Sequence, residues 1–182
     1  MAITAKMVAD LRAKTGVGMM ECKKALNEAN GDFDEAVKLL REKGLSVAAK
    51  KAGRIAAEGV VDIMTDGDTA VMIEVNAETD FVAKNETFKE FVRGIEKAII
   101  AGKPADVDAL LAMRYDDSFT VDEKLKDMIF TIGENMHIRR FVVVNGVFST
   151  YIHGAGTTGV IVKFNTDAAT AAKDGFATLR FR

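Results

Sequence analysis

Residues 74–84 read Glu-Val-Asn-Ala-Glu-Thr-Asp-Phe-Val-Ala-Lys, and this stretch joins an expected strand to an expected helix. The strand is predicted because side chains alternate with a period of two, with Val71, Ile73 and Val75 between Met72, Glu74 and Asn76. The helix is predicted because apolar residues recur at helical spacing: Phe88, Phe91, Val92, Ile95 and Ile99. Thr87 and Glu90 predict a capping box at its start. Residues 79–82, called the 79–82 turn below, are therefore expected at a strand-to-helix turn.

The 79–82 turn places an acid, Asp80, directly before a large aromatic residue, Phe81. Held between two rigid elements, such a turn could insert into another protein. The alternative is a local one, in which Phe81 and Val82 fold back under the next helix as a hydrophobic staple. Most loop aromatics serve local packing, and the residues alone leave both interpretations open.

Composition indicates an ordinary globular protein. The chain has 182 residues, of which 48% are apolar and 29% charged, and this length predicts one domain with an appendage or two small domains. The net charge of -2 gives no sign of a polyanion binder, so no direct nucleic-acid contact is expected. Cys22 is the single cysteine, which suits a reducing compartment. We find no membrane-spanning run and no apolar secretory signal, and therefore expect a cytoplasmic protein without membrane contact.

The first part of the chain, residues 4–43, predicts three short helices. Thr4 caps the first, and Asp32 with Glu35 caps the third, which is expected to end at Gly44. Three such helices make a small core, which favours a docking role over catalysis. The second helix begins with Met19 and Met20; either one faces outward toward a partner, or both belong to the core.

A basic, alanine-rich and partly helical connector is expected at residues 46–59, with a boundary near Gly53. Its cations, Lys50, Lys51 and Arg54, are predicted to lie on a solvated helix face, since few aromatic residues accompany them. We therefore predict an N-terminal docking module with its connector at residues 1–54 and a core at residues 55–182.

The core pattern runs strands, helices, strands. Asp66-Gly67 and Asn145-Gly146 both predict hairpins. The expected strands are 60–64, 68–76, 141–144, 147–152 and 159–164, and the expected helices are 85–101, 106–113, one from Thr120 to Gly133, and the start of 165–177. This order predicts an α+β fold: a three-helix module, similar in outline to ubiquitin-associated domains, followed by an antiparallel sheet packed with helices.

No catalytic constellation emerges from the residues. His137 and His153 stand apart without cysteine partners, so no metal site is predicted. Residues 154–159 spell a G-x-G-x-x-G string, but a strand pattern follows it where a dinucleotide site needs a helix, so we interpret it as a hairpin connection. Asp116-Asp117 and Asp122-Glu123 suit loops and helix caps. We expect no catalytic residues and no cofactor, and a binding protein rather than an enzyme.

Two long segments resemble motifs of bacterial translation elongation factor Ts. Residues 11–26 resemble the N-terminal motif of that family, and residues 74–84 resemble its second motif. Shorter similarities follow in the same order at 132–140 and 151–154. The resemblance runs from the start to about Phe164 and departs at Ala77, where the family more often has cysteine or serine. Most bacterial members continue further after this point, so the resemblance implies a naturally short or truncated form.

The resemblance implies a guanine nucleotide exchange factor that binds elongation factor Tu in its GDP-bound and nucleotide-free forms. It implies that Thr79, Asp80, Phe81 and Val82 insert near the magnesium and phosphate site of the partner, with Phe81 as the wedge and Asp80 disturbing the magnesium water shell. The implied docking residues are Arg12, Met19, Met20, Lys23, Ile132, Gly133 and His153.

The shorter chain predicts weaker but residual exchange, because the 79–82 turn and the N-terminal module are both present. A rival hypothesis is a non-enzymatic adaptor, whose three-helix module binds a helix or nascent chain at the ribosome while the basic connector touches ribosomal RNA.

Overall fold

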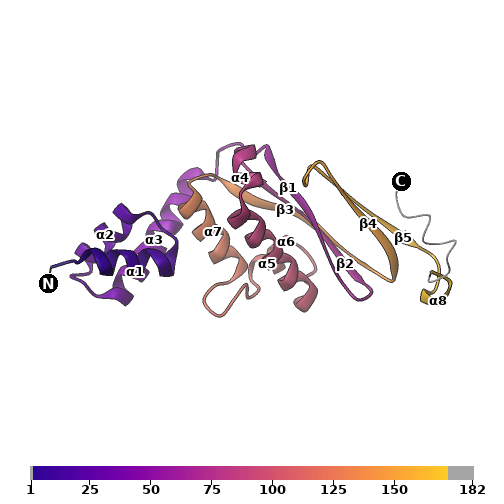
Figure 1. The fold of residues 1–182 in the computed structure, drawn as a ribbon, viewed down its shortest axis with the longest axis horizontal. Coiled ribbons are helices and arrows are strands. Elements are labelled where there is room, and N and C mark those ends of the chain that lie inside the picture. Colours follow the sequence, from indigo (N-terminus) through magenta and orange to yellow (C-terminus); the bar gives the residue numbers. More distant parts are fainter. Residues whose placement is uncertain (1, 172–182) are drawn as a thin grey trace. The chain divides into compact units, whose positions relative to one another are not determined.

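The computed structural model describes residues 2–171. By residue contacts the chain divides into two compact units (Figure 1). Unit 1 comprises Met1–Ile55 with Glu123–Asn135, and unit 2 comprises Ala56–Asp122 with Met136–Arg182. Contacts thus group residues 123–135 with the N-terminal helices. The domain boundary predicted between residues 54 and 55 stays a prediction. The α+β class with antiparallel sheets is confirmed.

Unit 1 is helical, and its helices begin at the predicted caps. The Thr4 side chain accepts a hydrogen bond from Met7 N at 3.2 Å, and Asp32 accepts one from Glu35 N at 2.9 Å, so each satisfies a free donor of a helix N-terminus. The helices are α1 (Ala5–Thr15), α2 (Met19–Glu28), α3 (Phe33–Lys51) and most of α7 (Val121–Ile132). The three-helix core is built from Val8, Leu11, Val17, Cys22, Ala25, Leu26, Ala29, Ala36 and Leu40.

The predicted end of the third helix at Gly44 is wrong. Helix α3 continues through Gly44 to Lys51, so the first part of the expected connector is helical. Gly44 is buried, and a Cβ placed on it would lie 3.5 Å from the ring of Phe130, which itself packs against the three-helix core. Glycine costs a helix about 1 kcal/mol relative to alanine. Close packing against α7 accounts for the glycine here, and a local stop signal does not.

Unit 2 contains a three-stranded antiparallel sheet with the order β1-β2-β3. Its strands are β1 (Glu58–Asp66), β2 (Thr69–Ala77) and β3 (Met136–Asn145). The hairpin predicted at Asp66-Gly67 is confirmed, since Asp66 pairs with Thr69. Helix α5 (Glu86–Gly102) lies along one face of this sheet (Figure 1) and buries its apolar side chains there.

The hairpin predicted at Asn145-Gly146 is wrong. Strand β3 pairs with β2, while β4 (Val147–His153) pairs with β5 (Thr158–Phe164) in a separate two-stranded sheet. Gly146 N donates to the carbonyl of Asp68 at 2.8 Å, and the Thr69 hydroxyl donates to the Asn145 side-chain oxygen at 2.9 Å. Pairing with the β1–β2 hairpin therefore outweighs the local turn preference, and Gly146, with φ of 111°, becomes the crossing point between two sheets.

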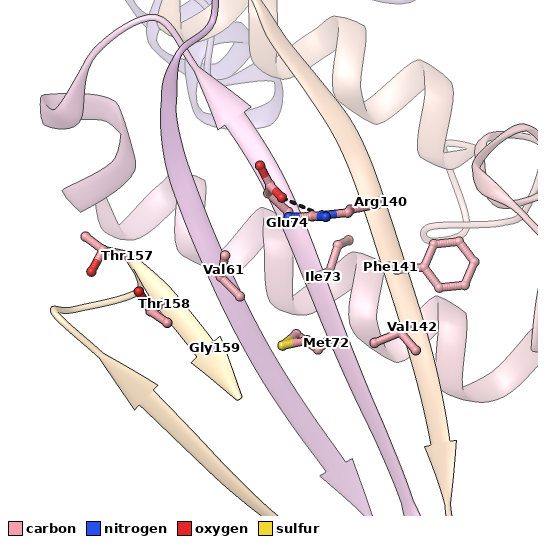
Figure 2. Close-up of a pocket in the computed structure, with 10 residues that line it drawn as sticks. All are labelled: Val61, Met72, Ile73, Glu74, Arg140, Phe141, Val142, Thr157, Thr158 and Gly159. Carbon is pink, nitrogen blue, oxygen red and sulfur yellow. Dashed lines mark hydrogen bonds and ion pairs between the residues drawn. The ribbon is translucent and has the colours of Figure 1, made fainter. Parts of the chain in front are cut away.

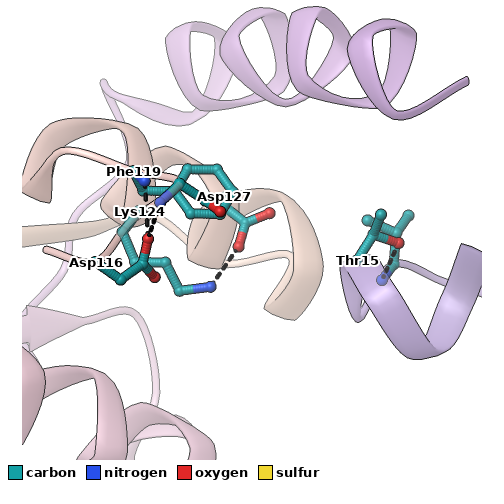
Figure 3. Close-up of polar contacts among 7 residues, drawn as sticks. Thr15, Asp116, Phe119, Lys124 and Asp127 are labelled. Carbon is teal, nitrogen blue, oxygen red and sulfur yellow. Dashed lines mark hydrogen bonds and ion pairs between the residues drawn. The ribbon is translucent and has the colours of Figure 1, made fainter. Parts of the chain in front are cut away.

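The remaining elements connect the sheets. Helix α6 (Val107–Leu111) is capped by Asp106, which accepts from Ala109 N at 2.8 Å. Asp116 acts as a loop former, as predicted, by accepting hydrogen bonds from the backbone of Ser118 and Phe119. Figure 3 shows Asp116 and Phe119. Helix α8 (Ala168–Ala171) begins the helix expected at 165–177, and the rest of that expectation lies outside the described residues. Among residues 2–171, no helix is long and apolar enough to cross a membrane.

Candidate functional site: the 79–82 turn and the exposed start of the second helix

The 79–82 turn leads into a short helix, α4 (Asp80–Lys84). Thr79 is its N-cap and accepts from Val82 N at 3.4 Å. Asn85 then serves both helices: its backbone N–H donates to Val82 O at 2.9 Å, and its side chain accepts from Thr87 N at 2.8 Å. The capping box predicted at Thr87 is therefore wrong, because α5 begins at Glu86 and Asn85 already supplies the capping oxygen.

Phe81 and Val82 are neighbours with opposite environments. Val82 is 7% exposed and anchors α4, whereas Phe81 is 83% exposed. The burial of Val82 therefore agrees with the local interpretation, whereas the exposure of Phe81 contradicts it. A phenyl ring this exposed gains nothing from the hydrophobic effect in the isolated chain, and it would gain on burial against another surface.

Asp80 forms an ion pair inside the same helix. Its carboxylate lies 2.6 Å from Lys84 Nζ, one helical turn later. The hydrogen bond and charge of Lys84 hold the pKa of Asp80 below its usual value, and the same contact raises the pKa of Lys84. Asp80 is thus an exposed, ionised carboxylate at neutral pH, held in place by a specific cation.

The four N-terminal residues proposed for docking are exposed at the surface of unit 1. Met19 and Met20, at 53% and 65% exposure, open α2, so the alternative that both belong to the core is wrong. Arg12 and Lys23 are exposed as well. Sequence reasoning did not single out Glu21, the residue after Met20: its carboxylate contacts Lys43 and Lys24, which lower its pKa. The first turns of α2 therefore present two exposed thioethers together with the charges of Glu21 and Lys23.

Ile132 and Gly133 lie at the end of α7, also in unit 1. Gly133, at φ of 88°, occupies the left-handed position that ends the helix, as predicted. Its carbonyl accepts a hydrogen bond from Lys51, and the buried Asn135 donates to the carbonyl of Arg54 at 2.7 Å. Lys51 was predicted to lie on a solvated helix face; it is partly exposed, and its ammonium also connects the end of α3 to the Ile132–Gly133 segment. The two residues are 82 positions apart, so no local pattern signals this contact.

His153 is an exposed residue of β4 in unit 2, and its Nδ1 lies 2.9 Å from the Tyr151 hydroxyl. It therefore shares a unit with the 79–82 turn, while the other docking residues belong to unit 1. The glycine-rich string at 154–159 is confirmed as a connection between β4 and β5, without the helix that a dinucleotide site requires.

Unit 2 also contains a groove that the sequence did not predict (Figure 2). It has a volume of about 410 Å³ and lies over Val61, Met72 and Val142, one residue from each strand of the three-stranded sheet. At one end Arg140 donates to Glu74 at 2.7 Å. The groove holds no arrangement of nucleophile and base, and within the described residues no three His, Cys, Asp or Glu side chains could hold a metal ion. Its chemistry suits contact with an apolar surface.

Comparison with known proteins gives a consistent result. The family model described as "Elongation factor TS" matches residues 78–177. Proteins named "Elongation factor Ts" from Syntrophotalea carbinolica and Clostridium novyi are 54% and 52% identical over 170 and 172 residues, each covering 91% of this chain. A third, from Clostridioides difficile, is 52% identical over 173 residues and covers 93% of the chain. The chain spans 56–57% of the length of these relatives.

Proposed function

The chain belongs to the elongation factor Ts family, and we propose from this that it acts in translation elongation as a guanine nucleotide exchange factor for elongation factor Tu. In this proposal it works in the cytoplasm and binds the GDP-bound and nucleotide-free forms of its partner. It promotes GDP release without catalysing a chemical reaction of its own. The chain spans little more than half the length of these relatives.

The observation that carries the proposal is the exposure of Phe81 on α4, a helix that other contacts already hold in place. Thr79 caps α4, and Val82 anchors it in unit 2, while Phe81 remains 83% exposed. Burying a phenylalanine side chain contributes roughly 1.5–3 kcal/mol. Coupling between two ligands of one protein is typically about 1–3 kcal/mol. Insertion of this one ring is therefore enough to make the factor and GDP weaken each other's binding.

The other residues of the proposed site have separate roles in this proposal. Asp80 is ionised and lies beside Phe81, so insertion of the ring would bring a carboxylate to the groups that hold magnesium. Met19 and Met20 offer adaptable apolar contacts for docking, while Lys23 on α2 and Arg12 on α1 offer exposed positive charge. Ile132, Gly133 and His153 would add further contacts.

The test is the release of fluorescent GDP from elongation factor Tu, measured with the native chain, Phe81→Ala and Ile55→Ala. Ile55 is 85% exposed and lies outside the proposed site, so it controls for the loss of an exposed apolar side chain. We expect acceleration by the native chain and by Ile55→Ala, and loss of most of it in Phe81→Ala. All three chains should unfold at the same temperature, because neither side chain is buried. No acceleration by the folded native chain would contradict the proposal.

The exposed methionine pair supports the adaptor as a second candidate, because thioethers adapt to varied helix surfaces. The adaptor predicts binding of an amphipathic helix or a nascent chain in the absence of elongation factor Tu. Substitution of Met19 and Met20 by Ala would then abolish that binding, while Phe81→Ala would leave it unchanged.

A further inference from the structure

We propose that Lys84 is a positioning residue of the exchange site: it holds the Asp80 carboxylate in place beside Phe81 and offsets its charge as the turn enters a nucleoside diphosphate site. The inference rests on the proposed function and extends it to a residue outside the 79–82 turn.

The geometry of α4 makes Lys84 suited to this role. The helix has five residues, and Asp80 and Lys84 are its first and last, so their contact at 2.6 Å spans its whole length. Both side chains are solvent-accessible, at 71% for Lys84 and 50% for Asp80. An acid four residues before a base is the favourable order on a helix, and each charge also lies at the end of the helix dipole that stabilises it.

The other contacts of α4 fix the position of its backbone. An isolated helix of this length is unstable in water, so its orientation depends on contacts to the rest of unit 2. The Thr79 hydroxyl binds Val82 N, Asn85 N binds Val82 O, and the Val82 side chain is buried. These contacts set where Phe81 lies. These contacts do not set the direction of the Asp80 carboxylate, which the Lys84 ammonium restrains through the ion pair.

The chemistry of the target explains why the cation matters. A site that binds a nucleoside diphosphate and a divalent cation contains phosphate oxygens and other anionic oxygen ligands. A bare carboxylate that approaches them meets like charge, which costs energy and slows association. The Asp80–Lys84 pair carries no net charge, yet it still presents carboxylate oxygens. A carboxylate already held in one direction also loses less conformational entropy when it binds.

The experiment compares native chain, Lys84→Gln, Lys84→Arg, Asp80→Asn and the Asp80→Asn/Lys84→Gln double variant. Lys97→Gln is the matched control, because Lys97 is an exposed cation on α5 away from the turn. Two quantities are measured: the maximal rate of fluorescent GDP release from elongation factor Tu, and the carboxyl pKa of Asp80 in the free chain, followed by NMR during a pH titration.

We expect Lys84→Gln to raise the pKa of Asp80 and to lower the maximal release rate by about two- to fivefold, the range expected for loss of an exposed ion pair. Lys84→Arg should restore both values, and Lys97→Gln should change neither. In the Asp80→Asn background, Lys84→Gln should have almost no further effect, because the group that it positions is gone.

Three results would overturn the inference. These are an unchanged Asp80 pKa in Lys84→Gln, an unchanged release rate, or an equal loss of rate in the presence and absence of Asp80, which would make Lys84 a direct partner contact. A native chain that does not accelerate GDP release would overturn the proposed function itself. Normal acceleration with no effect of Lys84→Gln would contradict only the role of Lys84.

Discussion

The two sheets of unit 2 are built from similar strands but differ greatly in how far their side chains are buried. In the three-stranded sheet, Val71, Ile73 and Val75 of β2 are at most 1% exposed. In the two-stranded sheet, no residue of β4 or β5 is buried, although Val160, Ile161 and Val162 follow one another there. Strand-forming residues are therefore not enough to make a core; a covering layer is needed as well.

The covering layer of the first sheet is α5. Its side chains Phe88, Phe91, Ile95 and Ile99 are 0–2% exposed, and the helix contacts both β1 and β2. A two-stranded hairpin on its own is at best marginally stable. The turn between β4 and β5 is attached to the larger sheet by the hydrogen bond from Val61 N to Gly156 O, at 2.7 Å. The first sheet should thus determine the stability of unit 2, and the second should contribute little.

The largest expected effect is that of Phe91→Ala compared with Phe148→Ala. Phe91, a residue of α5, is 2% exposed, and its removal should cost about 3–5 kcal/mol of unfolding free energy through lost burial and a cavity. Phe148 is only partly buried in β4, so its removal should cost about 1 kcal/mol or less. Urea unfolding followed by circular dichroism measures both. Equal losses would show that the two sheets share one core.

The next effect concerns Glu96, a carboxyl group buried within the helix-covered sheet. Glu96 is 1% exposed, so its carboxyl group is removed from water. Burial, together with the nearby Asp62 charge, raises the pKa of Glu96 to about 8. Its ordinary pKa in the unfolded chain is 4.5, so between these values the folded state holds a proton that the unfolded state has released. Stability from this group is therefore greatest at low pH and falls as pH rises toward 8.

Glu96→Gln should remove that dependence. The native chain should lose up to about 3 kcal/mol relative to the variant between pH 4.5 and pH 7, as the linkage between proton binding and folding requires. Unfolding by urea at pH 5, 7 and 8.5 gives the difference between the two chains at each pH. A difference that stays constant over this range would mean that Glu96 is ionised in the folded protein.

The smallest effect should come from Arg140→Ala, at the open face of the same sheet. Arg140 is 75% exposed at the side chain, while its partner Glu74 is 16% exposed and also lies 3.6 Å from Arg139. Because the pair is largely solvated and Arg139 remains, the loss should be about 0.5 kcal/mol. Thermal unfolding measures it, with Arg139→Ala as the matched single change. A loss above about 2 kcal/mol would indicate that the Glu74 charge is effectively buried.

Local sequence signals succeeded where the decisive contact is itself local. Thr4 and Asp32 cap their helices through hydrogen bonds to a residue three positions later, and Asp66-Gly67 turns between strands that pair at once. The predictions at Gly44 and at Asn145-Gly146 were wrong for the opposite reason. Phe130, 86 positions away in sequence, packs against Gly44, and β3 pairs with β2 and not with β4. Contacts with residues distant in sequence therefore determine the structure at both positions.

The sequence by itself determined the family, the fold class and the place of the 79–82 turn between a strand and a helix, because these depend on motif identity and on periodicity. Only the tertiary structure decided that Phe81 faces solvent while Val82 is buried, and that Lys51 binds the carbonyl of Gly133. The physical reason is that burial and long-range hydrogen bonds depend on which surfaces meet. That outcome follows from the packing of whole elements, and no stretch of neighbouring residues encodes it alone.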